Sequence, residues 1–344
     1  MSLPSVLSRL RLPVIGSPLF ILSNPELVIA QCTAGIVGSF PALNARPASQ
    51  LDEWLAQVTE ALAAWDRAHP EQPAAPFAVN QIVHRSNDRL EHDMELCARY
   101  RVPLVITSLG ARPEVNQAVH AWGGIVLHDV IDDRFARKAV EKGADGLIAV
   151  AAGAGGHAGT LSPFALVQEI RAWFDGPLVL SGAIARGESI LAAQAMGADL
   201  AYIGSAFIAT DEARAVPGYK QMVVDSSARD IVYSSLFTGV LGNYLRGSIV
   251  AAGLDPDADM AIGPVPGTEG EGVSFGVTAA RALQDGAIDG FWANGMGAEV
   301  AVRSGSGRLL VDARRHAPAG AADYTFPALV ATDRHDAERP DEVW

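Results

Sequence analysis

A glycine-rich loop with one histidine is the segment of this chain best suited to chemistry. It runs from Ala151 to Thr160 with the sequence AAGAGGHAGT, so His157 is its only titratable side chain. A backbone with so few side chains lets a flat or bulky ligand come close. An imidazole with an ordinary pKa accepts or donates a proton at neutral pH. A loop histidine is ordinarily a surface residue, but the position of His157 after a predicted strand favours a catalytic role.

Two further glycines follow apolar runs and suit an anion. Gly182 stands in Ser181-Gly182-Ala183, and Gly204 is followed by Ser205. Glycine lets backbone N–H groups approach phosphate oxygens, a short helix adds the positive end of its dipole, and the Ser205 hydroxyl can donate. Such glycines also make simple tight turns. Because both follow the last two predicted strands, where many barrel enzymes bind phosphate, the pattern favours a phosphate site.

The remaining candidates also stand where predicted strands end. They are Ser17, Pro18, Leu19, Asn80, Ser108 and His128. A metal site would need several histidines to converge with carboxylates, and these loops contain few Asp or Glu residues. We therefore expect no metal. No Ser or Cys motif beside His157 indicates a covalent nucleophile.

Eight short apolar runs must position these residues. They are Leu12–Gly16, Ile36–Phe40, Phe77–Ile82, Leu104–Leu109, Ile125–Val130, Leu147–Ala151, Leu178–Gly182 and Ala201–Ser205. Continuous hydrophobicity is typical of parallel strands that are buried on both faces. Most runs are followed by a longer amphipathic stretch, so the chain predicts a (β/α)8 TIM barrel of the α/β class. In such barrels the active site lies at the carboxyl ends of the strands.

Several helix ends can be read from the sequence. Asn24 should cap a helix that begins with Pro25 and stops at Gly35. The stretches Asp132–Lys142 and Arg186–Met196 are each followed by a glycine, which is typical of a helix C-terminus.

The pattern changes after Ala206. Residues 226–237 and 239–251 look helical, and no further strand-like run occurs until Arg308–Val311. We predict a barrel over residues 1–209, a helical substrate-side subdomain over 210–290, a return to the barrel over 291–312 and a C-terminal tail over 313–344. The tail mixes charges, Pro and Ala without periodicity.

Composition excludes several classes of partner. The 344 residues include 26 Lys and Arg against 39 Asp and Glu, a net charge of −13 without a basic cluster. Nucleic acid and an acidic membrane surface are therefore not expected. No run is uniformly apolar over the length of a membrane span. The cysteines, Cys32 and Cys97, form no CxxC motif, which favours a cytoplasmic location. Exposed helices of barrel proteins often pair between subunits, so the sequence is compatible with a homodimer but does not fix the oligomeric state.

The order of motifs resembles the nitronate monooxygenase family, formerly called 2-nitropropane dioxygenases. The resemblance runs from about residue 10 to 300, and Gly-Gly-His-x-Gly is its most specific element. The motifs are Ser17-Pro18-Leu19-Phe20, Phe77-Ala78-Val79-Asn80, Ala154-Gly155-Gly156-His157-Ala158-Gly159, Ser181-Gly182-Ala183-Ile184 and Ile203-Gly204-Ser205-Ala206-Phe207.

The resemblance implies non-covalently bound FMN and the oxidation of alkyl nitronates by O2 to a carbonyl compound and nitrite. The resemblance implies that Gly182, Gly204 and Ser205 would hold the phosphate of FMN. His157 matches the family's catalytic histidine. The residues implied to contact the rest of the cofactor are Ser17, Pro18, Leu19, Asn80, Ser108, His128, Gly155, Gly156 and Ser181.

This chain departs from the family pattern in places, which leaves the substrate open. Ala152-Gly153 replaces an acidic residue or Met, Leu19 and Phe20 replace Met and Gly, and His128 stands where some relatives have Lys. An FMN-dependent NAD(P)H reductase of quinones or enoyl thioesters shares the scaffold and the histidine loop. A flavin-free barrel acting on a phosphorylated metabolite, and a non-catalytic FMN-binding protein, are further alternatives.

Overall fold

The computed structural model describes residues 3–157, 159–234, 241–252, 256, 290–293, 308–312 and 328–331. Contacts between Cα atoms divide the chain into two compact units, residues 1–231 and 232–344. The boundaries expected at residues 209, 290 and 312 stay predictions.

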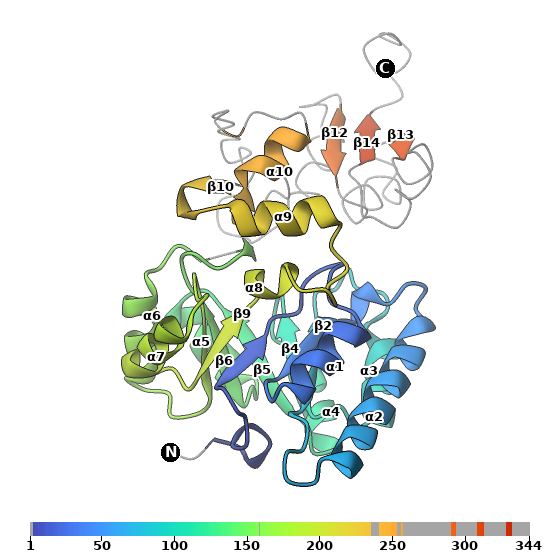
Figure 1. Cartoon of the computed structure of the whole chain (residues 1–344), viewed down its shortest axis with the longest axis vertical. Helices are drawn as coiled ribbons and strands as arrows, with labels where there is room; N and C mark the ends of the chain where they lie inside the picture. Colours follow the sequence, from blue (N-terminus) through green and yellow to red (C-terminus); the bar gives the residue numbers. More distant parts are fainter. Residues whose placement is uncertain are drawn as a thin grey trace. The chain divides into compact units, whose positions relative to one another are not determined.

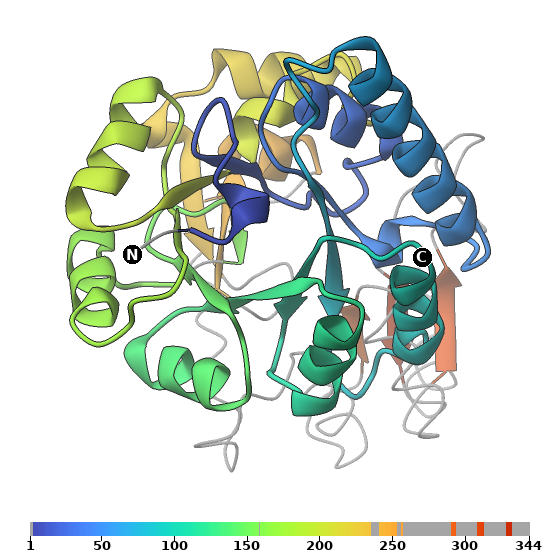
Figure 2. The same ribbon diagram turned by 90° about the horizontal axis from the view of Figure 1, so that it is seen from below.

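The first unit contains eight parallel strands in the order β1-β9-β8-β6-β5-β4-β3-β2, and a parallel bridge between Ile15 and Val37 joins the ends of this series. All eight predicted strands are present, and Figures 1 and 2 show the ring that they form within a layer of helices. The strands are β1 (Val14–Gly16), β2 (Gly38–Pro41), β3 (Phe77–Ile82), β4 (Leu104–Ser108), β5 (Ile125–Val130), β6 (Gly146–Val150), β8 (Leu178–Ser181) and β9 (Leu200–Ile203). The (β/α)8 barrel prediction is confirmed.

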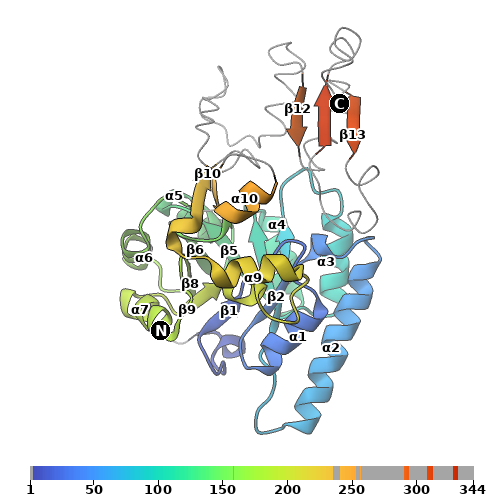
Figure 3. The same ribbon diagram turned by 45° about the horizontal axis from the view of Figure 1, so that its top comes forward.

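Helices follow the strands and cover their outer faces. In the layer, α2 packs against both α1 and α3 (Figure 3). The helices of this unit are α1 (Pro25–Thr33), α2 (Gln50–Ala68), α3 (Leu90–Arg99), α4 (Pro113–Ala121), α5 (Asp133–Glu141), α6 (Pro163–Arg171), α7 (Gly187–Met196), α8 (Ser205–Ile208) and α9 (Pro217–Asp225). Short 3-10 turns are η1 (Ser5–Leu7), η2 (Ala42–Asn44) and η3 (Ala228–Asp230).

The predicted helix ends are confirmed. The Asn24 side chain accepts a hydrogen bond from the Leu27 N–H at the start of α1, and Asp132 accepts one from the Phe135 N–H at the start of α5. At the end of α7, Gly197 adopts a left-handed conformation with φ of 112°, which a residue with a Cβ reaches only at a cost.

Alternation along the strands separates two apolar layers. Leu127, Ile148 and Val179 pack with one another inside the ring, whereas Val126 and Leu147 pack against the helices. Successive side chains of a strand point to opposite faces. On this phase the inner positions nearest the carboxyl ends are Asn80 of β3, Ser108 of β4 and Asp129 of β5, together with Ser181 of β8 and Tyr202 of β9.

Two segments that looked helical in the sequence are corrected in part, whereas α9 and α10 are helices within the expected subdomain. Strand β10 (Ile231–Ser234) occupies part of the stretch 226–237, and β11 (Gly242–Leu245) precedes the short helix α10 (Arg246–Ala251) within 239–251. Residues 235–240 lie outside the described part. Short apolar segments fit either a strand or a helix turn, so periodicity over a few residues gave the wrong element.

A second correction concerns the strands near the C-terminus. The predicted strand at 308–311 is present as β13 (Arg308–Asp312), and it pairs antiparallel with β14 (Ala328–Ala331). Strand β12 (Gly290–Ala293) pairs with the other edge of β14. Neither β12 nor β14 was predicted, because each is only four residues long and shows little alternation.

Within the described residues, every helix is too short or too polar to span a membrane.

Asn24 offers a test of how the first unit is held together. Its Oδ1 caps α1, and its Nδ2 donates to the Glu212 carbonyl at 2.9 Å, so one side chain joins two segments far apart in sequence. We expect Asn24→Ala to lower the free energy of unfolding by about 2 kcal/mol, since it removes a cap and a largely buried hydrogen bond. Asn24→Asp keeps the cap and should lose less. Urea unfolding followed by circular dichroism measures both; equal stability of Asn24→Ala and wild type would contradict this account.

Candidate active site

A chain of hydrogen bonds links three neighbouring strands at the carboxyl end of the barrel. Asn80 Nδ2 donates to Ser108 Oγ at 2.8 Å and to the Ile106 carbonyl at 3.1 Å. Ser108 Oγ in turn donates to Asp129 Oδ2 at 2.5 Å. The Asn80 and Ser108 side chains are buried. Both N–H groups of the Asn80 amide are therefore committed inside the protein, and its Oδ1 is left as the atom that can accept from a ligand.

Asp129 is the acidic group of this layer. Burial raises the pKa of its carboxyl from 3.8 to about 6, against the opposing effect of the Ser108 hydrogen bond. Its Oδ1 is buried and has no hydrogen-bond partner among the described residues. The pKa of the nearby Tyr202 hydroxyl is raised well above 10, mainly by burial and also by the charge of Asp129. The carboxyl can thus hold or release a proton close to neutral pH.

His128 does not join this group. Its Nδ1 lies 2.6 Å from Thr107 Oγ1, and both residues stand one position out of phase with Ser108 and Asp129, on the face toward the helices. Burial, and to a lesser extent the charge of Lys142, lowers the pKa of His128 to about 4, so its imidazole is neutral at pH 7. The expectation that His128 contacts the cofactor stays a prediction. The polar side chain that β5 presents to the barrel interior is the next one, Asp129.

The loop after β1 lies against the end of β9. Ser17 N–H donates to the Ile203 carbonyl at 2.8 Å. A Cβ placed on Gly204 would lie 2.5 Å from Ser17 Oγ and 3.1 Å from Leu19 Cδ2. The absence of a side chain at Gly204 therefore allows the two segments to meet, and Ser17, Leu19 and Gly204 are together as expected. Pro18 lies between Ser17 and Leu19 in the same loop.

The glycine-rich loop lies beside the segments after β8 and β9. A Cβ on Gly155 would lie 3.3 Å from Ser205 Oγ, and one on Gly182 would lie 2.9 Å from the Ala152 carbonyl oxygen. The Ala151 N–H donates to the carbonyl of Ser181 at 2.9 Å. Gly155, Ser181, Gly182, Gly204 and Ser205 therefore gather at one edge of the barrel.

Two details of this edge favour a bound anion. Gly204 immediately precedes α8, and the first N–H groups of a helix have no acceptor within it. Gly156 has φ of 68° and Gly182 has φ of 154°, and residues other than glycine rarely adopt these backbone conformations. Backbone donors and the Ser205 hydroxyl are thus accessible without any cation.

The backbone of His157 ends the two-residue strand β7 (Gly156–His157). Its side chain, and all of Ala158, lie outside the described residues. The catalytic role of His157 therefore stays a prediction.

Sequence reasoning did not choose Tyr202 or Asn44, and it placed Asp129 at a strand end beside His128 without assigning it a role. Asp129 is adjacent to the candidate His128, and only the phase of the strand distinguishes them. Asn44, in η2, bonds to the backbone of the loop after β1. No sequence signal marks it, because its partners lie more than twenty residues away. In the described part of the chain, no group of three His, Cys, Asp or Glu side chains could hold a metal ion.

Comparisons with known proteins agree with this geometry. The family model for nitronate monooxygenase matches residues 7–256. The nitronate monooxygenase of Paraburkholderia phytofirmans is 27% identical over 292 residues, which cover 71% of this chain and 76% of that protein. FabK from Thermotoga maritima superposes with a TM-score of 0.60 at 26% identity, over 70% of this chain and 73% of that one.

A nitroalkane oxidase from Streptomyces ansochromogenes has the same fold, with a TM-score of 0.61 at 24% identity, over 70% of this chain and 79% of that one. The family match covers the whole barrel and all the candidate residues. The chain therefore belongs to the nitronate monooxygenase family and is a flavin-dependent oxidoreductase.

Proposed function

We propose that the flavin of this enzyme is FMN, held without a covalent bond at the carboxyl ends of the barrel strands, and that alkyl nitronates are oxidised there. O2 is the co-substrate, and the products are a carbonyl compound and nitrite. The observation that carries the proposal is the glycine-lined edge at Gly182 and Gly204, which lies beside the polar ends of the strands.

The residues present fit FMN. A phosphate needs several donors close together, and the start of α8 supplies backbone N–H groups next to the Ser205 hydroxyl. A flat ring needs a surface free of side chains, which Gly155 and Gly156 provide. Its polar edge needs buried hydrogen-bonding atoms, and Asp129 Oδ1 is such an atom, without a partner in the described part of the protein.

The roles of the binding residues follow from their hydrogen bonds. Ser205 Oγ and the N–H groups at the start of α8 would hold the phosphate, with Gly182 giving its oxygens room. Asn80 would accept a hydrogen bond through Oδ1, since its Nδ2 is committed to Ser108 and Ile106. Ser108 donates to Asp129 and accepts from Asn80, so it orients these two groups.

Bound FMN would supply the electron transfer between substrate and O2. The chain itself must handle protons. The imidazole of His157 would take the α-proton from a neutral nitroalkane or orient the nitronate anion. Leu19 and the exposed Phe20 lie in the loop beside Gly204, where they would limit the size of the substrate. The two cysteines are free and buried, which supports a reducing cytoplasm as the proposed compartment.

The purified protein provides a direct test. We expect a yellow protein that releases nitrite from the nitronate of 2-nitropropane in air. His157→Asn should retain the flavin spectrum but lose at least about 100-fold in turnover, because positioned acid–base groups contribute rate factors of this size. A yellow protein without nitrite release, whose flavin is rapidly bleached by NADH or NADPH under anaerobic conditions, would assign the reductase alternative instead.

Gly204 tests the placement of the cofactor site. In Gly204→Ala the new Cβ would lie 2.5 Å from Ser17 Oγ and 3.1 Å from Leu19 Cδ2, so both side chains of the loop after β1 must shift. We expect the dissociation constant for FMN, measured by fluorescence, to rise at least about tenfold, since misplacement by a fraction of an ångström is costly at such sites. Gly218→Ala is the matched control, because a Cβ there meets nothing within 4 Å. Unchanged FMN affinity in Gly204→Ala would argue against this site.

Asp129 makes a prediction about pH. Because burial raises its pKa from 3.8 to about 6, the folded chain disfavours the ionised form. Its contribution therefore lowers stability as pH rises through this window. Asp129→Asn lacks this effect and should be the more stable protein by about 3 kcal/mol at pH 7 to 8 in the absence of ligand. The difference should shrink as pH falls toward about 4. Urea unfolding at several pH values measures it, and a difference independent of pH would contradict the assignment.

A further inference from the structure

The Asn44 side chain makes three hydrogen bonds, and all of them go to the backbone of a neighbouring loop. Its Oδ1 accepts from the Ile21 N–H at 2.8 Å, and its Nδ2 donates to the carbonyls of Leu19 and Ser23, each at 2.9 Å. All three partners belong to the loop that follows β1. Asn44 itself stands at the end of η2, so the side chain crosses from one βα loop to the next.

The loop after β1 needs such support. Ile21 has φ of 69°, in the left-handed region that is unfavourable for a β-branched residue. Within the loop, Ser23 Oγ accepts from the Leu19 N–H, and the Ser23 N–H donates to the Leu19 carbonyl, both at 2.9 Å. The Asn44 amide completes this turn by bonding the backbone on both sides of Ile21.

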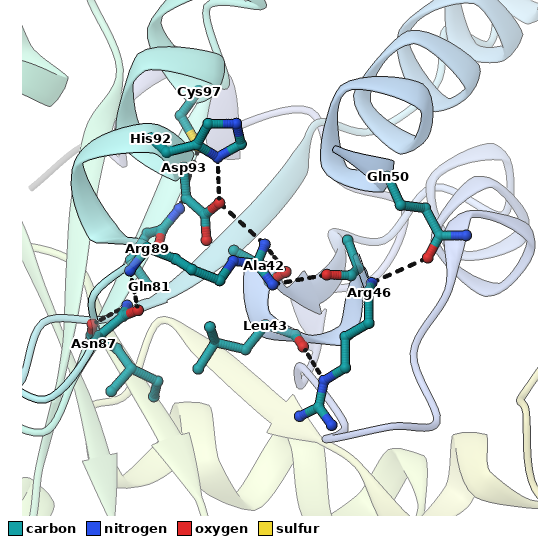
Figure 4. Close-up of polar contacts among 12 residues, drawn as sticks. Ala42, Leu43, Arg46, Gln50, Gln81, Asn87, Arg89, His92, Asp93 and Cys97 are labelled. Atoms are coloured by element: carbon teal, nitrogen blue, oxygen red, sulfur yellow. Dashed lines mark hydrogen bonds and ion pairs between the residues drawn. The ribbon is translucent and has the colours of Figure 1, made fainter. Parts of the chain in front are cut away.

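The segment that carries Asn44 is itself held from behind. Arg89 donates through Nη1 to the Ala45 carbonyl at 2.8 Å and through Nη2 to the Ala42 carbonyl at 3.3 Å. The same guanidinium pairs with Asp93 at 3.1 Å, a carboxylate that is fully buried in α3. Figure 4 shows Arg89 between Asp93 and Ala42. The backbone on both sides of Asn44 is therefore fixed to the barrel's helical layer.

A second contact joins the same two segments. The Arg46 guanidinium lies 5.5 Å from the centre of the Phe20 ring, within the range of a cation–π interaction. Phe20 is 51% exposed and follows Leu19 directly. We call residues 42–46 the η2 segment and the loop that follows β1 the β1 loop. The η2 segment thus contacts both the backbone of the β1 loop and the Phe20 ring in that loop.

We propose that Asn44 is a positioning residue for the active site: it selects the one conformation of the β1 loop in which Ser17 and Leu19 rest against Gly204. The proposal rests on the proposed function, because that loop is there assigned to the cofactor and the substrate. The three hydrogen bonds of Asn44 all go to backbone atoms of residues 19–23, so Asn44 would act through that backbone.

The effect of losing Asn44 follows from the fraction of molecules whose loop is correctly folded. A ligand that binds only this form has an apparent dissociation constant that rises as the fraction falls. FMN and substrate should therefore bind more weakly, while the turnover of a fully loaded enzyme changes little. A residue needed only for global stability would change the melting temperature without this separation of KM from kcat.

The experiment compares Asn44→Ala with Asn116→Ala in the full-length protein. Asn116 is a buried asparagine within α4 whose Nδ2 donates to the carbonyl of Lys142, the residue that caps the C-terminus of α5. For Asn44→Ala we expect the FMN dissociation constant and the KM for the nitronate to rise about tenfold, with kcat within about threefold of wild type. Asn116→Ala should lower the melting temperature and leave both constants unchanged.

Hydrogen exchange gives a readout independent of flavin. The amides of residues 19–23 should exchange at least about tenfold faster in Asn44→Ala than in wild type, and at the wild-type rate in Asn116→Ala. If wild type binds no FMN, the proposed function fails, yet exchange still tests the role of Asn44 in the loop. Unchanged exchange in Asn44→Ala would overturn the proposal, and so would faster exchange with unchanged FMN affinity and KM.

Asn44→Asp and Ile21→Gly make the result specific. Asn44→Asp keeps an oxygen for the Ile21 N–H but loses the two donated bonds, so its constants should lie between those of wild type and Asn44→Ala. Glycine adopts positive φ readily. We therefore expect Ile21→Gly to recover part of the FMN affinity when combined with Asn44→Ala. No recovery, with Asn44→Asp equal to wild type, would mean that the hydrogen bonds do not set the loop conformation.

Discussion

Side-chain alternation along the parallel strands is the constraint on which the site depends. Successive side chains of a strand point to opposite faces, so every second residue faces the interior of the ring. There Leu127, Ile148 and Val179 form a packed apolar layer, which we call the plug. The plug excludes water from the barrel below the site. The next inner position, toward the carboxyl end, is polar on β3, β4 and β5. This change from apolar to polar within two residues creates a platform of hydrogen-bonding groups on a rigid base.

The platform presents side-chain groups, whereas the edge of the barrel at Gly182, Gly204 and Ser205 presents mainly backbone donors. This division suits a chain with a net charge of −13. Side chains carry the polar groups of β3 to β5, and a carboxyl group, Asp129, is among them. At β8 and β9, glycine backbone and one hydroxyl carry the donors. Backbone N–H groups bind phosphate through local dipoles, so the edge needs no lysine or arginine. The net negative charge of the chain is therefore compatible with an anionic cofactor.

The sequence predicted the scaffold far better than the orientation of residues on it. Continuous apolar runs identified all eight strands, and Asn24 and Gly197 identified helix ends, because these signals are local. The same continuity conceals the phase of each strand, so the sequence did not distinguish the orientation of His128 from that of Asp129. The contacts of Asn44 depend on pairing between loops, which no local pattern records. Strand β10 was taken for part of a helix because a segment of four residues has no resolved period.

The ion pair between the partly buried Arg89 and the fully buried Asp93 shows how such long-range order is enforced. A buried ion pair contributes little net stability, because desolvation offsets its attraction. Here Arg89 Nε and Asp93 Oδ2 have no partner in the described part of the chain, so the pair is not fully satisfied either. The pair instead fixes the orientation of the Arg89 guanidinium, and this planar group donates to two backbone carbonyls at once. Its structural role is then to hold the η2 segment in one place, and through Asn44 that constraint reaches the loop beside Gly204.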